Sequence, residues 1–372
     1  MAFNMTTATP NATIPVVYID ASRYEIPLAT KVIIGVLFLI GFPCGLLGNV
    51  LVIFAVAFTR LRQRVSSLLI LNLAVTDLLV SALPMPLYGI YYVFYWPQWD
   101  FGRPLCKVSH YVMRVCGTMS VLTLVVIAID RYFAVIRNRL LARRQRMSLV
   151  LSVLWFISLV AMVYPLLGDG VEYVSLGGKN FDVCVKMSGE PIKEKSFVAT
   201  LLLQTVVSVL IVSCLLGIYI TMIRSIWRTR HLSGTNDVEV QGKRQNSRAV
   251  VLMFVILVAF IISWVPYWLV TLFRLYPPNK EKGIDPSVVL VFYTFAILNS
   301  AWNPVLYALV SKGFRKAYKQ IMTGNFQYSV RSSGYQDGTR ATRIRAFSGK
   351  QSFNRTGTSE VEKGEQASEK DK

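Results

Sequence analysis

Seven stretches of this sequence are apolar over roughly 20 residues or more, the length that lets a helix cross the hydrocarbon core of a bilayer. Only 16% of the residues are charged, whereas soluble domains carry about 25%. We therefore predict an all-α membrane protein, folded as a seven-transmembrane helix bundle over residues 30–310. The predicted spans are 30–58, 66–95, 105–136, 147–167, 197–226, 249–275 and 286–310.

Basic residues are distributed unevenly among the loops between these spans. The loops after the first, third and fifth spans hold about twice as many Lys and Arg residues as the alternate loops, and such an excess is typical of cytoplasmic loops. We therefore predict a multi-pass plasma-membrane protein with an extracellular N-terminus and a cytoplasmic C-terminus. The net charge of +20 follows from this topology and from attraction to anionic membrane lipid, so it does not indicate nucleic-acid binding.

Residues 1–29 precede the first span and lack the basic and then apolar pattern of a cleaved signal peptide. The first span is therefore predicted to act as the insertion signal. Asn4 and Asn11 each begin an Asn-x-Thr tripeptide, the acceptor for N-linked glycosylation. Because the topology puts this segment outside, we predict an extracellular, glycosylated N-terminal tail.

The five cysteines fall into two groups. Cys44, Cys116 and Cys214 lie within apolar runs, where a cysteine is by default a small buried apolar residue. Cys106 and Cys184 are the two that face the oxidising side of the membrane, so we predict a disulfide between them. The alternative is that both remain free thiols.

A few charged residues lie within or at the ends of the predicted spans, where charge is costly and usually functional. They are Asp77, Arg114, Asp130, Arg131 and Arg274. Pro266 and Pro304 interrupt the sixth and seventh spans, and each removes one intrahelical hydrogen bond. We expect these two helices to be kinked, with polar groups or water meeting the freed backbone groups.

A series of short motifs accompanies these features. It comprises GNVLV at 48–52, LAVTD at 73–77, WDFG at 99–102, Cys106, DRY at 130–132, Trp155, Tyr219, WVP at 264–266 and NPVLY at 303–307. In this order and at these depths, the motifs resemble those of the rhodopsin-like (class A) G protein-coupled receptors over residues 30–322. The resemblance implies a receptor that activates heterotrimeric G proteins, and not an enzyme. A membrane transporter is the alternative, but transporters tend to contain internal repeats, and we find no duplication between the two halves.

The resemblance implies a role for the charge pair at the end of the third span. Arg131 lies 25 residues beyond Cys106, about 37 Å along a helix, and so at the cytoplasmic mouth. Asp130 is expected to hold Arg131 at rest and to release it toward Tyr219 and the G protein on activation. The family often has an acid on the sixth helix facing this arginine, but this chain has Asn246, so we expect basal signalling. The other residues that the resemblance assigns to coupling and activation are Tyr132, Asn303, Pro304 and Tyr307.

The resemblance also assigns two further sets of residues, a switch beneath the ligand and a sodium pocket. Trp264 is the expected switch beneath the ligand, with Phe260 one turn below it and Pro266 above it; Ile211, facing Val121, replaces the proline usual on the fifth helix. We therefore expect a straighter fifth helix.

The second set of residues matches a sodium pocket. The alternative is a hydrated polar network around a protonated Asp77. Its residues are Asp77, Ser120, Asn299, Ser300 and Asn303, and no cofactor other than this allosteric ion is expected.

The ligand is constrained mainly by exclusion. Amine receptors carry an aspartate where this chain has Met113, and opsins need a lysine in the seventh span, which residues 286–310 lack. Residues 173–186 alternate around Gly-Gly, a hairpin pattern that is typical of peptide-binding members of the family. A peptide, as for the neuropeptide receptors, is the first choice; a lipid or a small acidic ligand is the alternative. The candidate ligand contacts are Met113, Arg114, Gln204, Tyr267 and Arg274.

Arg114 and Arg274 suggest a ligand rich in hydrogen-bond acceptors, because neither has an acidic partner within the spans. The alternative is that Arg114 pairs with a loop acid, Glu172 or Asp182, and only closes the pocket.

Residues 311–322 place apolar side chains on one face and lysines elsewhere, which predicts an amphipathic helix on the membrane surface. Residues 323–372 are polar and are predicted to form a disordered cytoplasmic tail. Thr356, Thr358 and Ser359 lie beside acids there. By the resemblance they are sites for receptor kinases that recruit arrestin; the alternative is a plain solvated tail.

Overall fold

The computed structural model describes residues 17–19, 26–63, 65–137, 144–163, 170–176, 179–185, 191–232, 237–275 and 285–324. The chain divides into a unit of residues 1–328 and a unit of residues 329–372, and all the described residues belong to the first. The predicted glycosylation sites Asn4 and Asn11 and the predicted tail from residue 325 onward lie outside the described residues.

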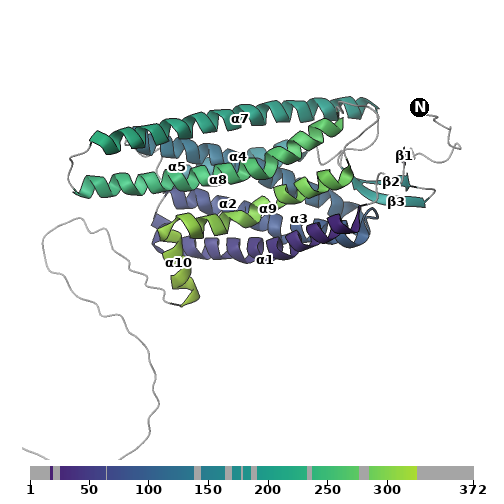
Figure 1. Cartoon of the computed structure of the whole chain (residues 1–372), viewed down its shortest axis with the longest axis horizontal. Coiled ribbons are helices and arrows are strands. Elements are labelled where there is room, and N and C mark those ends of the chain that lie inside the picture. Colours follow the sequence, from purple (N-terminus) through teal and green to yellow (C-terminus); the bar gives the residue numbers. More distant parts are fainter. Residues whose placement is uncertain are drawn as a thin grey trace, which may run out of the picture. The chain divides into compact units, whose positions relative to one another are not determined.

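The described residues contain seven helices that are long and apolar enough to cross a membrane, which confirms the predicted all-α architecture (Figure 1). The second span is composite: a helix is followed by a new helix that begins at Pro84, where a proline needs no amide hydrogen, and then by a π-helical turn. The elements are α1 (Leu28–Phe58), η2 (Arg60–Gln63), α2 (Val65–Ala82), α3 (Pro84–Ile90), η3 (Tyr91–Tyr95), α4 (Gly102–Ile136), α5 (Arg144–Ala161), α7 (Pro191–Leu232), α8 (Asp237–Leu275), α9 (Pro286–Val310) and α10 (Lys312–Met322).

The boundaries of two helices differ clearly from those predicted. α7 begins before and ends after the predicted span 197–226, and α8 begins at Asp237 rather than at residue 249. Hydropathy locates only the part of a helix that lies in lipid, whereas the backbone hydrogen bonds of a helix continue equally well in water. The apolar pattern therefore underestimates both helices.

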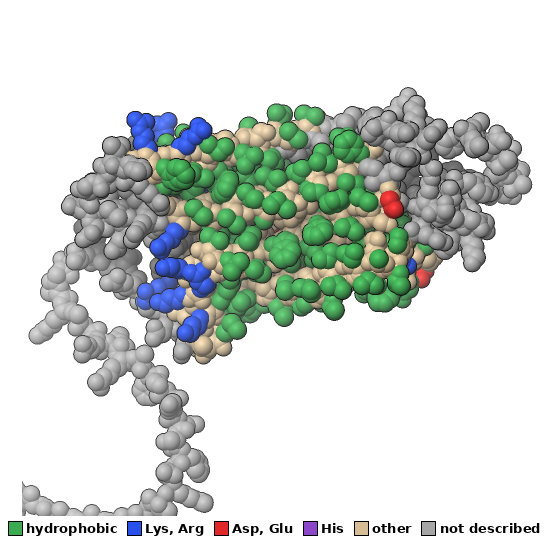
Figure 2. Space-filling view, in the orientation of Figure 1, with side chains coloured by type: hydrophobic (Ala, Val, Ile, Leu, Met, Phe, Trp, Pro, Cys, Tyr) green, Lys and Arg blue, Asp and Glu red, His purple; other side chains and the backbone are tan. Residues whose placement is uncertain are grey.

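Apolar side chains cover the middle of the described surface, and charged side chains gather toward its ends (Figure 2). Leu39 is 76% exposed and Phe156 is 68% exposed, although both are large and apolar. Side chains of this kind are stable on an outer surface when the surrounding medium is lipid. The distribution supports a multi-pass membrane protein.

α1 and α9 pack closely because glycines of α1 face α9. A Cβ atom added to Gly48 would lie 2.8 Å from the Cβ of Pro304. Small residues allow membrane helices to approach in this way. Beside Gly48, the buried amide of Asn49 donates hydrogen bonds to the carbonyl oxygens of Gly45 (2.8 Å) and of Ser300 in α9 (2.9 Å).

A small sheet lies at one end of the bundle, hereafter the hairpin end (Figure 1). Strands β2 (Gly170–Leu176) and β3 (Lys179–Val185) pair antiparallel, which confirms the predicted hairpin. Strand β1 (Val17–Ile19) pairs parallel to β2, so the order is β1-β2-β3. A strand of three residues is too short to give a periodic signal, and the sequence did not indicate β1.

α10 lies at the opposite end, hereafter the basic end, and confirms the predicted amphipathic helix (Figure 1). Phe314, Ala317 and Tyr318 are buried. The Tyr318 hydroxyl donates a hydrogen bond to the carbonyl oxygen of Pro304 (3.4 Å). The apolar face of α10 therefore packs on the bundle, and its contact with the membrane surface remains a prediction.

Candidate functional site

Asp130 and Arg131 form a buried ion pair at the basic end. The Nε of Arg131 donates a 3.1 Å hydrogen bond to the Oδ2 of Asp130, and Nη2 contacts the same oxygen. The predicted contact between these residues is thus confirmed. Asp130 is 1% exposed and Arg131 8%, so the pair is held out of water by the helices around it. A buried pair that loses one partner leaves an uncompensated charge, which is strongly unfavourable.

Two buried tyrosines lie at the same end. The hydroxyls of Tyr219 on α7 and Tyr307 on α9 have no hydrogen-bond partner among the described residues. Tyr219 is close enough to Arg131 to interact with its charge. Buried polar groups normally have hydrogen-bond partners, and Tyr219, which interacts with Arg131, can form a new hydrogen bond without breaking one among the described residues. Tyr132 is partly buried beside Phe133, and the side chain of Asn246 lies outside the described residues.

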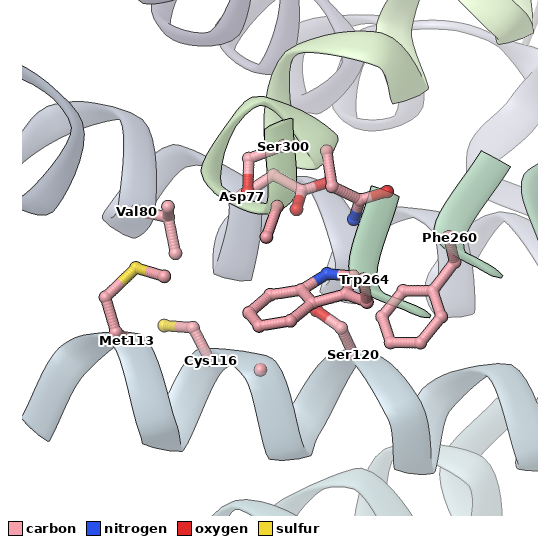
Figure 3. A pocket seen from close by; sticks show the side chains of 11 residues that line it. Asp77, Val80, Met113, Cys116, Ser120, Phe260, Trp264 and Ser300 are labelled. Atoms are coloured by element: carbon pink, nitrogen blue, oxygen red, sulfur yellow. The ribbon is translucent and has the colours of Figure 1, made fainter. Parts of the chain in front are cut away.

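A small cavity lies in the middle of the bundle, between α2, α4, α8 and α9 (Figure 3). The centre of a water-sized sphere can occupy about 10 Å³ of it, which suits one water molecule or one small ion. Its polar lining comes from Asp77, Ser120, Asn299 and Ser300, so the structure brings four of the five predicted sodium ligands to one cavity. The fifth, Asn303, donates a 2.7 Å hydrogen bond to Asp77.

The chemistry of this lining fits a sodium ion. Asp77 is 2% exposed, and a buried carboxylate is stable only when it is protonated or has a cation beside it. Carboxylate, hydroxyl and amide oxygens are ligands that suit a hard cation. Ser120 is held in place by a 3.3 Å hydrogen bond with Thr76. The presence of the ion itself remains a prediction.

The predicted switch residues line this cavity and a second hollow beside it. Trp264 stacks on Phe260 with ring centroids 6.0 Å apart, and both line the central cavity. Ile211 and Val121 line a second, apolar hollow together with Phe260, so these residues meet as predicted. α7 continues through Ile211 as one helix, and Pro266 lies within α8.

An aromatic cluster fills the part of the bundle nearer the hairpin end, and Tyr267 is the one predicted ligand contact within it. The Tyr267 ring lies 5.0 Å from that of Tyr293, which in turn lies 5.7 Å from Tyr88 and 6.4 Å from Tyr92. Sequence reasoning missed Tyr88, Tyr92 and Tyr293. The run YGIYYVFYW at 88–96 was a local signal, but the partner on α9 lies about 200 residues away.

Of the other four ligand candidates, the structure describes the side chains of Met113 and Arg114. Met113 is buried and lines the central cavity. Arg114 is partly buried, and it lies close enough to Tyr88 to interact with its hydroxyl. The side chains of Gln204 and Arg274 lie outside the described residues. All ligand contacts therefore remain predictions.

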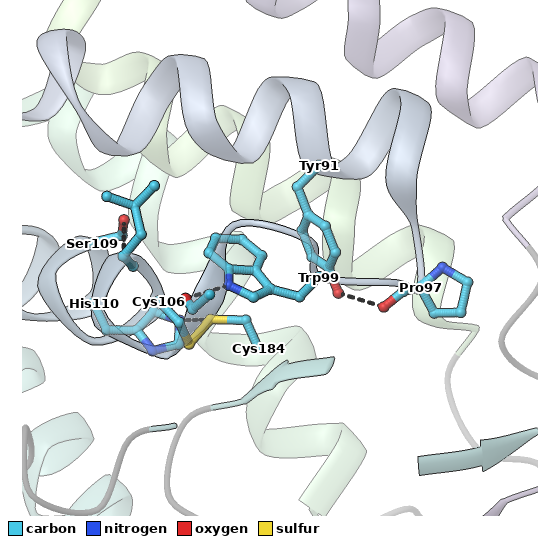
Figure 4. Close-up of a disulfide and its surroundings, with 9 residues drawn as sticks. Tyr91, Pro97, Trp99, Cys106, Ser109, His110 and Cys184 are labelled. Carbon is cyan, nitrogen blue, oxygen red and sulfur yellow. Dashed lines mark hydrogen bonds between the residues drawn. A yellow bond between two sulfur atoms is a disulfide. The ribbon is translucent and has the colours of Figure 1, made fainter. Parts of the chain in front are cut away.

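A disulfide joins Cys106 on α4 to Cys184 on β3, which confirms the predicted pair and makes the free-thiol alternative wrong (Figure 4). Its Cα atoms are 5.8 Å apart. His110, one turn along α4, places its Nε2 3.8 Å from the sulfur of Cys184. The bond therefore fixes the hairpin to the end of α4.

Hydrogen bonds fix the hairpin a second time, two residues before Cys184. The backbone amide of Trp99 donates to the carbonyl oxygen of Asp182 (2.6 Å), and the amide of Asp182 donates to the Oε1 of Gln98 (3.0 Å). The Trp99 indole donates to the carbonyl oxygen of Gly102 (2.9 Å), which shapes the WDFG segment into this clamp. Gln98 is a positioning residue that the sequence did not indicate.

A buried polar link joins three helices nearer the basic end. The indole of Trp155 on α5 donates to the Oδ1 of Asn72 on α2 (2.8 Å). The amide of Asn72 donates to the Oγ1 of Thr123 on α4 (2.8 Å). Trp155 belongs to the recognised motifs, but Asn72 and Thr123 do not, because a single polar residue in an apolar run gives no indication of its partner.

Comparisons with known proteins agree with this arrangement. A family model described as 7 transmembrane receptor (rhodopsin family) matches residues 48–307. The allatostatin-A receptor of Bombyx mori is 28% identical over 303 residues, covering 80% of this chain and 82% of that protein. The tachykinin-like peptides receptor 86C of Drosophila melanogaster is 28% identical, and the match covers 80% of this chain and 60% of that receptor. The galanin receptor 2b of Danio rerio is 30% identical, and the match covers 79% of this chain and 75% of that receptor.

Overall similarity does not by itself select the kind of ligand. A histamine H2 receptor and a GQ-coupled rhodopsin match at 28% and 30% identity, close to the values of the peptide receptors. Particular residues of the binding region must therefore separate these classes.

Proposed function

The chain belongs to the rhodopsin family of seven-transmembrane receptors, and from this premise we propose that it binds an extracellular peptide and activates heterotrimeric G proteins across the membrane. Members of this family are receptors and not enzymes. The observation that carries the proposal is the buried Asp130–Arg131 pair at the opposite end of the bundle from the clamped hairpin. One end offers a site for a ligand, and the other holds a charge that can be released.

Signalling then consists of an exchange of partners at the basic end. In the resting receptor Asp130 neutralises Arg131. When the helices around the pair separate, the guanidinium can turn toward Tyr219, whose buried hydroxyl has no partner among the described residues. An inserted segment of a G protein can accept the remaining hydrogen bonds of Arg131, since a guanidinium carries five donors. The free energy lost when Arg131 leaves Asp130 is therefore regained only when a G protein is bound.

Peptide is the proposed ligand class for three reasons. The hairpin is attached to α4 through Cys106 and to the Gln98–Trp99 clamp, so its position is fixed without a ligand. The names of similar receptors include those of peptides. Met113 stands where amine receptors need an acid, and residues 286–310 contain no lysine for a retinal Schiff base. A lipid or small acidic ligand is the second candidate, supported by Arg114 alone.

The proposed orientation puts the hairpin end outside the cell and the basic end in the cytoplasm. The disulfide supports it, because such bonds persist in oxidising compartments. The exposed Arg and Lys side chains around Arg131 also support it, by the positive-inside rule.

We also propose that sodium binds beside Asp77 when the receptor is inactive. Asp77, Ser120, Asn299, Ser300 and Asn303 would hold the ion, which would supply the positive charge that the buried carboxylate needs. Closure of the small cavity on activation would expel it.

Regulation by kinases and arrestin is the final part of the proposal. It is supported by the sequence of the tail, in which Thr356, Thr358 and Ser359 lie next to acids.

Nucleotide exchange tests the proposed function directly. Purified receptor in lipid nanodiscs is mixed with a G protein and screened against a peptide library, with calcium and cAMP responses in cells as the parallel readout. We expect at least one peptide to accelerate exchange. Solute flux across vesicles, without nucleotide exchange, would instead establish a transporter.

A further inference from the structure

The disulfide that joins the hairpin to α4 has a histidine beside it (Figure 4). Among the residues that the structure describes, Cys106, His110 and Cys184 are the Cys, His, Asp or Glu side chains that bring three metal-ligand atoms within 4.8 Å of one another. We propose that they form a redox-gated zinc site. When a dithiol in solution reduces the bond between Cys106 and Cys184, the two thiolates and the His110 imidazole bind one Zn²⁺ in its place.

The chemistry of this exchange balances with the dithiol and the zinc ion alone. The dithiol gives two electrons to the disulfide and becomes a disulfide itself, while the receptor gains two thiols. Zn²⁺ then replaces the two thiol protons, which pass to water, because the thiolate is the form of cysteine that binds a metal. Two cysteines and one histidine, with a water molecule as the fourth ligand, are a known zinc-binding set in proteins. The oxidised pair offers no thiolate, so the intact bond excludes the ion.

α4 places two of the three ligands together. Cys106 and His110 are four residues apart within this helix, so they lie on one face of it. The Nε2 of His110 lies 3.8 Å from the sulfur of Cys184. An imidazole nitrogen and a thiolate sulfur on one tetrahedral zinc ion lie about 3.6 Å apart at the usual bond lengths. The histidine therefore already has nearly the separation from Cys184 that zinc requires.

Reduction allows the two sulfur atoms to reach their positions as ligands. Two thiolates on one tetrahedral zinc ion lie about 3.8 Å apart. Rotation about the Cα–Cβ bond of either cysteine can supply this separation once the sulfurs are no longer bonded. Cys184 is partly exposed, whereas Cys106 is 0% exposed. The sulfur of Cys184 is therefore the one that a dithiol can attack.

The hairpin has a second attachment that does not depend on the disulfide. The amide of Trp99 donates to the carbonyl oxygen of Asp182 (2.6 Å), and the amide of Asp182 donates to the Oε1 of Gln98 (3.0 Å). Asp182 lies two residues before Cys184 on the same strand, so both side chains project from the same face of β3. These hydrogen bonds persist when the disulfide is reduced, and they keep Cys184 next to His110.

Packing holds His110 in place as a ligand. The residue is 4% exposed, and its ring stacks on that of Tyr88 with ring centroids 6.0 Å apart. A neutral imidazole suits such a buried position, and it is also the form that binds zinc. Tyr88 contacts Tyr293, which contacts Tyr267, so a bound ion would lie next to the aromatic cluster.

Zinc binding to the purified, full-length receptor tests this proposal. The background is C44S/C214S, which removes the two exposed free thiols and leaves the buried Cys116. Receptor in nanodiscs is reduced with a water-soluble phosphine, which leaves no competing thiol, and Zn²⁺ is then titrated without oxygen. We expect one tightly bound zinc ion per reduced receptor and none in the oxidised receptor. Zinc should also raise the thermal unfolding midpoint of the reduced receptor, because it replaces the lost link.

Two variants of the histidine and one matched control identify the ligand. H110F keeps an aromatic ring beside Tyr88 but has no ligand atom. Its reduced form should bind zinc about a hundredfold more weakly or worse, since even losing a residue that only orients a ligand costs about 10- to 100-fold. H110C supplies a third thiolate and should retain binding. S109A is the control, because the Ser109 hydroxyl bonds to the carbonyl oxygen of Leu105 within the helix (2.7 Å), and its zinc affinity should be unchanged.

Three results would overturn the proposal. Equal zinc binding by the oxidised and reduced receptor would locate the ion elsewhere, and unchanged affinity in H110F would exclude the histidine. If H110F fails to fold, Co²⁺ replaces Zn²⁺ in the background receptor. A thiolate-to-cobalt charge-transfer band should then appear only after reduction, and its absence would rule the site out. Neither an agonist nor a G protein takes part, so these results do not depend on the proposed function.

Discussion

The side-chain amide of Asn303 lies 2.7 Å from the carboxylate of Asp77 and donates a hydrogen bond to it, joining α9 to α2 in the middle of the membrane. The bond meets part of the hydrogen-bonding need of a buried carboxylate, but an amide brings no net charge. A cation or a proton must supply that charge. The proposed sodium ion would therefore bind at the point where α2 and α9 are joined.

Asp77→Asn should abolish any effect of sodium on agonist affinity. In the unmutated receptor we expect sodium to weaken agonist binding several-fold, because the ion stabilises the inactive arrangement. Competition binding across a sodium series, with potassium as the matched salt, measures this. Ser81→Ala is the control, since Ser81 is buried on α2 but does not line the cavity. A flat sodium series in the unmutated receptor would exclude the ion.

Arg131→Ala should remove G-protein activation while leaving surface expression and ligand binding largely intact. The substitution takes away the charge that the G protein is proposed to meet. Nucleotide exchange at saturating ligand is the measurement. Arg146→Ala, which removes an exposed arginine of α5, should retain exchange. Normal exchange by the Arg131 variant would contradict the proposed role.

Cys106→Ser and Cys184→Ser should each lower surface expression and ligand affinity, because the hairpin then loses its covalent bond to α4 and keeps only non-covalent contacts such as the Asp182 clamp. Losing such a bond costs about 2–4 kcal/mol in typical proteins. The double variant should be no worse than either single variant, and additive losses would argue against a shared bond. The expectation of buried thiols was wrong for Cys44 and Cys214, which are free and exposed, and right for Cys116. Cys44→Ser should therefore have little effect.

Gly48→Ala should destabilise the receptor by about 1–3 kcal/mol, as overpacking does. The new methyl group would lie 2.8 Å from the Cβ and 2.9 Å from the Cγ of Pro304, whose ring cannot rotate away. Gly217→Ala is the matched control, because nothing lies within 4 Å of its added Cβ. Thermal unfolding in detergent compares the two. Equal midpoints would show that α1 and α9 adjust freely.

Trp155→Phe should cost about 0.6 kcal/mol, the average for hydrogen bonds between membrane helices, and at most about 1.7 kcal/mol. The variant keeps most of the ring but leaves the Oδ1 of Asn72 without its donor. The same thermal assay applies. Asn72→Leu in the Trp155→Phe background should add less than Asn72→Leu alone, because the two residues share one bond.

The sequence predicted the spans and the hairpin because both depend on local periodicity and turn residues. The central cavity is different: Asp77, Ser120 and Asn299 come from three helices, and only the resemblance to a known family indicated that they meet. Contacts that the resemblance did not indicate were not predicted. The Asn72–Trp155 bond joins residues 83 positions apart, and no local pattern carries that information.

The two bonds from Arg315 to Ala308 and Leu309, with the bond from Tyr318 to Pro304, attach α10 to the last turns of α9. α9 and α10 are therefore linked, and Pro304 is the nearest point at which α9 can bend. A rotation of α9 below Pro304 would therefore move the end of α10, where Met322 is 79% exposed. A spectroscopic label at that position would report the movement of α9 from outside the bundle, without disturbing any buried residue.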